Sequence, residues 1–176
     1  MTQSDTPDHN TPATEAQSAG FAAIIGAPNA GKSTLVNRLT GSKVSIVTQK
    51  VQTTRFPVRG IAIEGQAQIV LVDTPGIFTP RRRLDRAMVA SAWGGAEGAD
   101  VVVHLIDAAS HIASGGKDGT AADRRSAEDT ETIIENLKAN GTQVILALNK
   151  IDGMRRDTLL ALSHSLFETG VYNEVY

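Results

Sequence analysis

The chain has 176 residues, of which 41% are hydrophobic and 4% aromatic, so its length fits one compact domain with a core of aliphatic side chains. The net charge of −2 argues against a chain that is basic overall and binds nucleic acid by charge alone. The absence of cysteine excludes disulfides and thiolate metal sites, and no apolar run approaches the roughly 20 residues that a membrane helix needs.

The first 19 residues form a separate compositional zone. They contain no Lys, no Arg and, after the initiator Met, no aliphatic side chain larger than Ala. They therefore lack the basic start and apolar centre of a signal peptide and the arginines of a mitochondrial transit peptide. Because such a stretch cannot bury enough apolar surface to offset its ordering entropy, we expect residues 1–19 to be a disordered tail.

The rest of the chain alternates between strand and helix patterns. Nearly continuous β-branched runs, typical of strands buried on both faces, lie at 21–26, 68–73, 100–107 and 143–149. The alternating segment 57–63 predicts an edge strand that turns into the next one, and helical periodicity recurs at 35–39, 133–137 and 159–167. This alternation predicts an α/β fold: an open, doubly wound, mostly parallel sheet with helices on both faces, whose ligands bind beyond the carboxyl ends of the strands.

The stretch "GAPNAGKST" at 26–34 follows the first strand and opens a helical pattern. Gly26 and Gly31 enclose four residues and are followed by Lys32 and Ser33, which is the phosphate-loop pattern. Glycine lets the backbone wrap a phosphate closely, so that N–H groups and the helix N-terminus point at negative charge. Lys32 would then reach the β- and γ-phosphates and Ser33 would ligate Mg²⁺. The alternative is an ordinary Gly-rich turn between a strand and a helix.

The second motif, "LVDTPG" at 71–76, places a carboxylate at the end of an apolar strand. Asp73 there can hold Mg²⁺ opposite Ser33, and Gly76 can offer its N–H to a γ-phosphate, because a backbone without Cβ can approach closely. Alone, this motif also fits a simple turn.

The third motif is Asn149-Lys150-Ile151-Asp152, after the last apolar run. The Asp152 carboxylate can accept hydrogen bonds from the N1–H and the exocyclic amine of guanine, a pair of donors that adenine lacks. Sites built to bind a polar group reject analogues without it. Asn149 would brace the loop and the Lys150 stem would cover the base. By itself, the motif could be an exposed polar turn before a helix.

The order of the three motifs is that of the GTPase superfamily within the phosphate-loop NTPase fold. We therefore expect GTP or GDP as the ligand. The expected nucleotide-binding residues are Gly26, Ala27, Pro28, Asn29, Ala30, Gly31, Lys32, Ser33, Thr34, Asp73, Thr74, Pro75, Gly76, Ile77, Asn149, Lys150, Ile151 and Asp152.

The segment "SKVSIVTQKVQTTRFPVRGI" at 42–61, together with the two motifs that flank it, resembles the Era family of bacterial GTPases, in the TrmE/Era class. The likeness is close over about 20–106 and looser over 130–176, and "KVQTTR" is its most specific part. In that family the Thr before the Arg completes the Mg²⁺ shell when GTP is bound. The resemblance implies this role for Thr54, with Thr53 as the fallback, and hence a loop held only while γ-phosphate and metal are present.

The residue after Gly76 bears on mechanism. Ras-like GTPases carry a Gln there to orient the attacking water, whereas this chain has Ile77, an apolar replacement that the Era family shares. In several relatives a K⁺ ion, held partly by the Asn of the phosphate loop, supplies positive charge. The resemblance implies Asn29 for that role, unless Asn29 only stabilises the loop. The expected catalytic residues are thus Asn29, Lys32, Thr54 and Gly76.

The resemblance breaks in two places. Residues 108–129 are longer and more Gly-rich than the family has there, and we expect a surface loop insertion before a helix. The family also continues past residue 176 with a sixth strand, a Ser-Ala loop that touches guanine, a final helix and an RNA-binding KH domain. "VYNEVY" looks like only the opening of that strand. We therefore expect 20–176 to be a C-terminally incomplete G domain from which the last strand, the last helix and the KH domain are absent.

The leading hypothesis is a GTPase that uses Mg²⁺ and K⁺. The resemblance implies a role in small ribosomal subunit assembly, 16S rRNA contact through the absent KH domain, weak membrane association, a monomer, and a cytoplasmic location, peripheral to the inner membrane at most. A second hypothesis is a nucleotide-gated binding module with negligible hydrolysis. A third is an ATP-dependent kinase or ATPase.

Overall fold

A computed structural model describes residues 18–47 and 54–176. Most of the expected tail, residues 1–17, and the fallback residue Thr53 lie outside the described residues. The expected tail boundary at residue 19 is wrong, because Ser18 and Ala19 already belong to the first strand and pair with Ala67 and Gln68.

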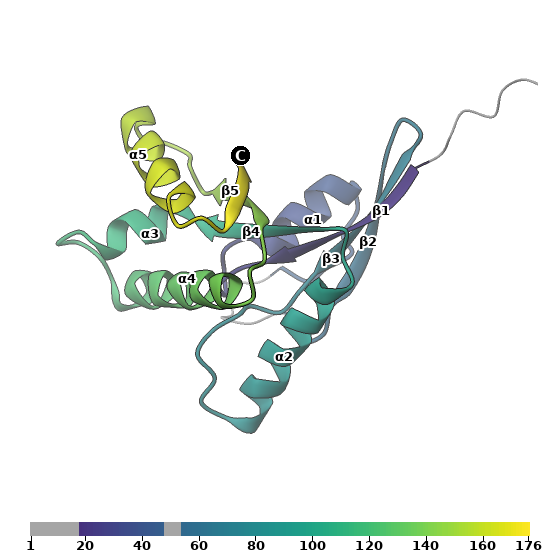
Figure 1. The fold of residues 1–176 in the computed structure, drawn as a ribbon, viewed down its shortest axis with the longest axis horizontal. Coiled ribbons are helices and arrows are strands. Elements are labelled where there is room, and N and C mark those ends of the chain that lie inside the picture. The colour runs from purple at the N-terminus through teal and green to yellow at the C-terminus, as the bar shows by residue number, and fades with distance from the viewer. Residues whose placement is uncertain (1–17, 48–53) are drawn as a thin grey trace, which may run out of the picture.

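The described residues contain one six-stranded sheet in the order β2-β3-β1-β4-β5-β6 (Figure 1). Its strands are β1 (Ser18–Ile25), β2 (Val58–Glu64), β3 (Ala67–Asp73), β4 (Val101–Asp107), β5 (Val144–Asn149) and β6 (Tyr172–Val175). Every pairing is parallel except that of β2 with β3. The alternating segment is therefore an antiparallel edge strand, as its pattern predicted, and the apolar runs form the parallel centre.

Helices cover both faces of the sheet, which confirms the predicted doubly wound fold. They are α1 (Lys32–Thr40), α2 (Arg83–Glu97), α3 (Ala108–Ser114), α4 (Ala121–Ala139) and α5 (Arg156–Phe167). Neighbouring strand residues point to opposite faces. Accordingly, Ile24 and Leu105 join Val36 of α1 in one core cluster, whereas Ile25 and Ile106 join the larger cluster that α2, α4 and α5 contribute to.

The expected surface loop at 108–129 is wrong over most of its length. Residues 108–114 are α3, and α4 begins at Ala121, which leaves 115–120 as the connection. Each helix has a side-chain N-cap: Asp107 accepts from the Ser110 N–H, and Thr120 accepts from the Asp123 N–H. Such caps satisfy N–H groups that have no partner within the helix, so a Gly-rich composition did not prevent helix formation.

The expectation that the last strand is absent is also wrong. Tyr172–Val175 form β6, which runs parallel to β5 and carries the buried Tyr172 on its inner face. The reason is local: Val171 and Tyr172 are each at most 3% exposed, so the start of this segment is part of the core. None of the helices in the described part of the chain is both long enough and apolar enough to cross a bilayer.

Candidate functional site

The loop 26–31 joins the end of β1 to the start of α1, and its two glycines are required by geometry. Gly26 has φ 151° and Gly31 has φ 103°, which lie in the backbone region that side chains disfavour. A Cβ at Gly26 would collide with the Leu105 carbonyl of β4, and one at Gly31 would collide with the Asn149 amide. The loop therefore lies against the carboxyl ends of β4 and β5.

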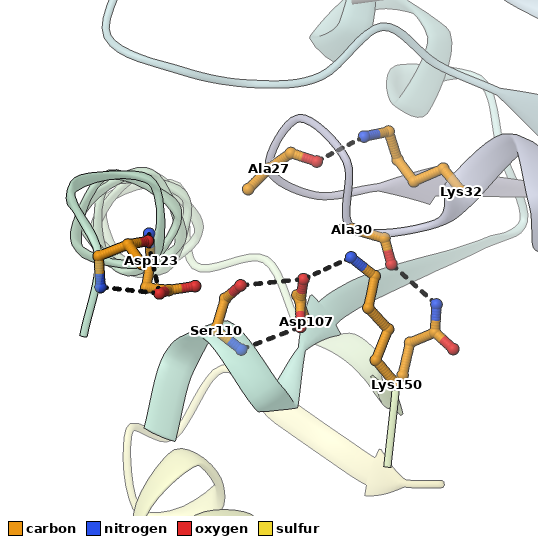
Figure 2. A network of polar contacts seen from close by, with 9 residues as sticks. Ala27, Ala30, Lys32, Asp107, Ser110, Asp123 and Lys150 are labelled. Carbon is orange, nitrogen blue, oxygen red and sulfur yellow. Dashed lines mark hydrogen bonds and ion pairs between the residues drawn. The ribbon is translucent and has the colours of Figure 1, made fainter. Parts of the chain in front are cut away.

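Lys32 opens α1, and its side chain is only 7% exposed. Its ammonium donates to the carbonyl of Gly26 at 2.9 Å, and so the side chain folds back along the loop. It also donates to the carbonyl of Ala27 at 2.8 Å, the bond drawn in Figure 2. Burial lowers the pKa of Lys32 to about 8, and the nearby Asp73 carboxylate opposes that shift. In the described part of the chain this buried cation donates hydrogen bonds to carbonyls alone, so it is well placed to take an anionic ligand.

Three side chains from three segments meet beside Lys32. The Ser33 hydroxyl donates to Asp73 Oδ2 at 2.6 Å, the Thr54 hydroxyl donates to the same oxygen at 3.2 Å, and the two hydroxyls are 3.2 Å apart. Asp73 is fully buried, and within the described part of the chain its Oδ1 has no hydrogen-bond partner. A hard oxygen set with an unsatisfied buried carboxylate oxygen fits Mg²⁺, which takes one or two carboxylates and completes its shell with water and phosphate.

The segment after Asp73 packs directly on the phosphate loop. The buried Thr74 hydroxyl donates to the Ile24 carbonyl at 2.7 Å, and the Ile77 N–H donates to the Gly26 carbonyl at 3.1 Å. Pro75 is fully buried. A Cβ on Gly76 would come within 2.9 Å of Pro28 atoms, so Gly76 permits the close approach of the two loops. Ile77 is 1% exposed and belongs to the core.

Two consecutive residues of the third motif, Asn149 and Lys150, are held by contacts with other elements. The Asn149 amide donates to the Ala30 carbonyl at 2.8 Å, and the Lys150 ammonium lies 2.6 Å from Asp107 Oδ2 (Figure 2). Ile151 and Asp152 follow as exposed residues. The expected bracing role of Asn149 thus has a partner, the phosphate loop itself. The structure brings all three motifs to one edge of the sheet.

Two of the residues expected to bind the nucleotide, Asn29 and Thr34, are exposed. Asn29 is exposed, has φ 64°, and no side-chain hydrogen bond to it is seen in the described part of the chain. Thr34 is exposed in the first turn of α1. The sequence analysis did not identify Asp107, which pairs with Lys150 of the third motif. Its position could have indicated it, since Asp107 ends an apolar strand just as Asp73 does.

A family model described as 50S ribosome-binding GTPase matches residues 21–150. Among curated proteins, the GTPase Era of Caulobacter vibrioides strain NA1000 is 67% identical over 166 residues, which is 94% of this chain and 52% of that protein. The GTPase Era of Maricaulis maris is 57% identical over 157 residues, covering 89% of this chain and 50% of the relative. The chain thus spans about half the length of these relatives.

Solved structures agree with the fold. Era in complex with MgGDPNP and nucleotides 1506–1542 of 16S ribosomal RNA matches with a TM-score of 0.74 and 36% identity, covering 91% of this chain and 50% of that one. An Aquifex aeolicus Era variant bound to GDP·AlF4⁻ matches with a TM-score of 0.72 and 36% identity, covering 90% and 50%.

Proposed function

The chain belongs to the family of 50S ribosome-binding GTPases, and from this membership we propose that it binds GTP and hydrolyses it to GDP and phosphate. One observation carries the proposal: Ser33, Thr54 and Asp73 converge within hydrogen-bonding distance beside the buried Lys32. This is the set of groups that a nucleoside triphosphate and its metal require. The relatives named GTPase Era support it.

We infer that Ser33, Thr54 and Asp73 would hold Mg²⁺. When bound there, the metal would supply positive charge to the phosphate oxygens. Asp73 Oδ1, which has no partner among the described residues, supports this, because a buried carboxylate oxygen without a donor is costly unless a cation meets it. Lys32 would leave the carbonyls of Gly26 and Ala27 and bind the β- and γ-phosphates. The N–H groups of the loop and the start of α1 would stabilise the remaining charge, and Gly76 would position the γ-phosphate.

In this proposal no side chain acts as a general base that takes a proton from the attacking water. Ile77 is apolar and buried, so it cannot orient a water as the Gln of Ras-like GTPases does. Asn29, in contrast, is exposed at the loop surface with its amide uncommitted in the described residues. We propose that its oxygen helps to hold K⁺, which is a hard-cation role that an amide oxygen can fill.

Guanine would be selected by the third motif. Asp152 is exposed and free to accept the two donors of the base, while Asn149 keeps the loop fixed on the Ala30 carbonyl. An adenine would leave the carboxylate unpaired, which is the basis of strong discrimination. This assignment argues against the ATP-dependent reading.

We further propose a cytoplasmic role in small ribosomal subunit assembly. The Era in the structural match is bound to 16S ribosomal RNA nucleotides, although the family description names the 50S subunit. We favour 16S rRNA because that match is to Era itself, the same protein as the curated relatives. The RNA contact would belong to the part of those proteins beyond this chain.

Single-turnover hydrolysis of GTP with Mg²⁺, measured in K⁺ and in Na⁺, tests the proposal. We expect hydrolysis in both salts and about tenfold faster hydrolysis in K⁺, a factor worth about 1.4 kcal/mol of transition-state stabilisation. Asn29→Ala should abolish the difference, whereas Asn136→Ala, an exposed Asn on α4, should keep it. Equal rates in the two salts would refute the K⁺ role. Tight GTP binding without hydrolysis would favour the nucleotide-gated binding module instead.

A further inference from the structure

The Asp107 carboxylate at the end of β4 is the centre of a small polar network (Figure 2). It is 6% exposed and has donors on both oxygens. Oδ1 accepts from the Ser110 N–H at 3.0 Å, and Oδ2 accepts from the Ser110 hydroxyl at 3.1 Å and the Lys150 ammonium at 2.6 Å. Because Ser110 holds the carboxylate at two points, its orientation is set independently of Lys150.

Lys150 combines an unusual backbone conformation with this ion pair. Its φ of 57° lies in the left-handed region, which is sparsely populated by residues with a side chain. Its side chain is 45% exposed while the ammonium is bound to a carboxylate that is nearly buried. The ion pair therefore fixes the ammonium of Lys150, and the methylene groups of its exposed side chain offer an apolar surface to a flat base.

Asp107 also lies in register with the neighbouring residue of the motif, since Asp107 and Asn149 are partners across the β4–β5 ladder. Asn149 is held on the phosphate loop and Lys150 on Asp107, so two consecutive residues are anchored to two different elements. Asp152, two residues further along, then projects from a loop whose backbone is already fixed. Preorganisation of this kind lowers the cost of binding.

We propose that Asp107 is a positioning residue for guanine nucleotides: its fixed carboxylate holds Lys150 so that the stem of that lysine covers the base and the loop presents Asp152. The inference rests on the proposed function. In this proposal residues 107–110 increase the affinity for the nucleotide. Asp107, the N-cap of α3, does so by fixing a residue that contacts the base.

Asp107→Asn tests the proposal, because Asn caps a helix as well as Asp but carries no charge. In the 176-residue chain we expect GDP and GTP to bind about tenfold more weakly, which corresponds to about 1.4 kcal/mol. The rate at saturating GTP should stay within about twofold, because the change lies in binding that ground and transition states share. Asp157→Asn, which removes the exposed ion pair with Arg155, is the matched control and should bind as the unchanged chain does.

A double-mutant cycle separates positioning from general stability. Lys150→Met should weaken binding, and Asp107→Asn should add no further loss in that background, because the two residues act as one unit. A further loss would mean that Asp107 acts through the fold, which would overturn the proposal. Unchanged GDP affinity in Asp107→Asn alone would also overturn it, whereas an unchanged chain that binds no guanine nucleotide would overturn the proposed function with it.

A second variant covers the case in which Asp107→Asn does not fold. Ser110→Ala removes the hydroxyl that orients the same carboxylate and leaves the Asp107 charge in place. We expect it to weaken GDP binding by about threefold, as the loss of a neutral hydrogen bond does. Unchanged affinity in a folded Ser110→Ala protein would count against the proposal.

Discussion

His104 is a fully buried residue of β4, and among the described residues its imidazole has one hydrogen-bond partner. Its Nδ1 lies 2.8 Å from the Tyr172 hydroxyl of β6, while Nε2 has no partner within the described part of the chain. Burial lowers the pKa of His104 to about 3, and the charges of Lys32 and His111 act in the same direction. Burial also raises the pKa of Tyr172, so that both rings stay neutral. The pair lies in the core and joins β4 to β6.

Because the pKa of His104 is lowered in the folded chain, the free energy of unfolding should fall as the pH falls. The unfolded chain takes up a proton below about pH 6.5, but the folded chain does not do so until about pH 3. We compare the free energy of unfolding of the unchanged chain with that of His104→Gln. The difference between the two should become less favourable to the unchanged chain by about 2 kcal/mol as the pH falls from 6.5 to 4.5. Urea titrations at each pH measure this difference. A His104→Gln difference that stays constant between these pH values would contradict the shift.

At the scale of elements, α4 depends on its first turn. The Thr120 hydroxyl accepts from the Asp123 N–H at 3.2 Å, and Asp123 Oδ2 accepts from the Thr120 N–H at 2.9 Å. This reciprocal capping box satisfies two backbone groups. Hydrogen bonds from Thr120 hold the pKa of Asp123 below its ordinary value. The helix then delivers Ile133, Ile134 and Leu137 to the core.

Removal of the cap should be measurable. We expect Thr120→Ala to lower the free energy of unfolding by about 1 kcal/mol, because the first turn loses its side-chain acceptor. Thr132→Ala is the matched control on the same helix, where the exposed hydroxyl only donates back to the Glu128 carbonyl. That variant should stay within about 0.5 kcal/mol. Chemical denaturation of both proteins gives the comparison, and equal losses would show that the cap contributes nothing specific.

The elements differ in how far the sequence predicts them. Strands β1, β3, β4 and β5 carry long apolar runs, so their positions and their parallel pairing were predicted. Residues 108–129 were misassigned because the glycines at 115, 116 and 119 are typical of a loop. Asp107 and Thr120 are residue types favoured at a helix N-cap, and each stands directly before one of the two helices. The ion pair of Asp107 with Lys150 could not be predicted, since it depends on the β4–β5 register.

At the scale of the whole molecule, the nucleotide would join segments that are far apart in the sequence. Ser33, Asp73 and Asn149 come from three different regions of the chain: Ser33 lies in the first turn of α1, and Asp73 and Asn149 are the last residues of β3 and β5. A ligand that contacts all three binds the folded state and not the unfolded one. Binding should therefore stabilise the entire domain by mass action.

Thermal unfolding tests both this linkage and the choice of base. At about 100 times the dissociation constant, Mg²⁺ with GDP or GTP should raise Tm by about 5–10 °C, and the same concentration of ATP should not. Asp152→Asn should transfer the stabilisation from GTP to XTP, because the amide reverses the required donor and acceptor. An equal rise with ATP in the unchanged chain would revive the ATP-dependent kinase or ATPase reading.

The antiparallel ladder between β2 and β3 has a mechanical consequence. Val58, the first residue of β2, pairs with Asp73, the last residue of β3. The segment with Thr54 enters the sheet at this rung, and the segment with Gly76 leaves it there. Both loops therefore join the sheet at the same rung, and the two seven-residue strands extend about 20 Å away from it. A displacement of this hairpin would therefore move the Thr54 segment and the Gly76 segment together.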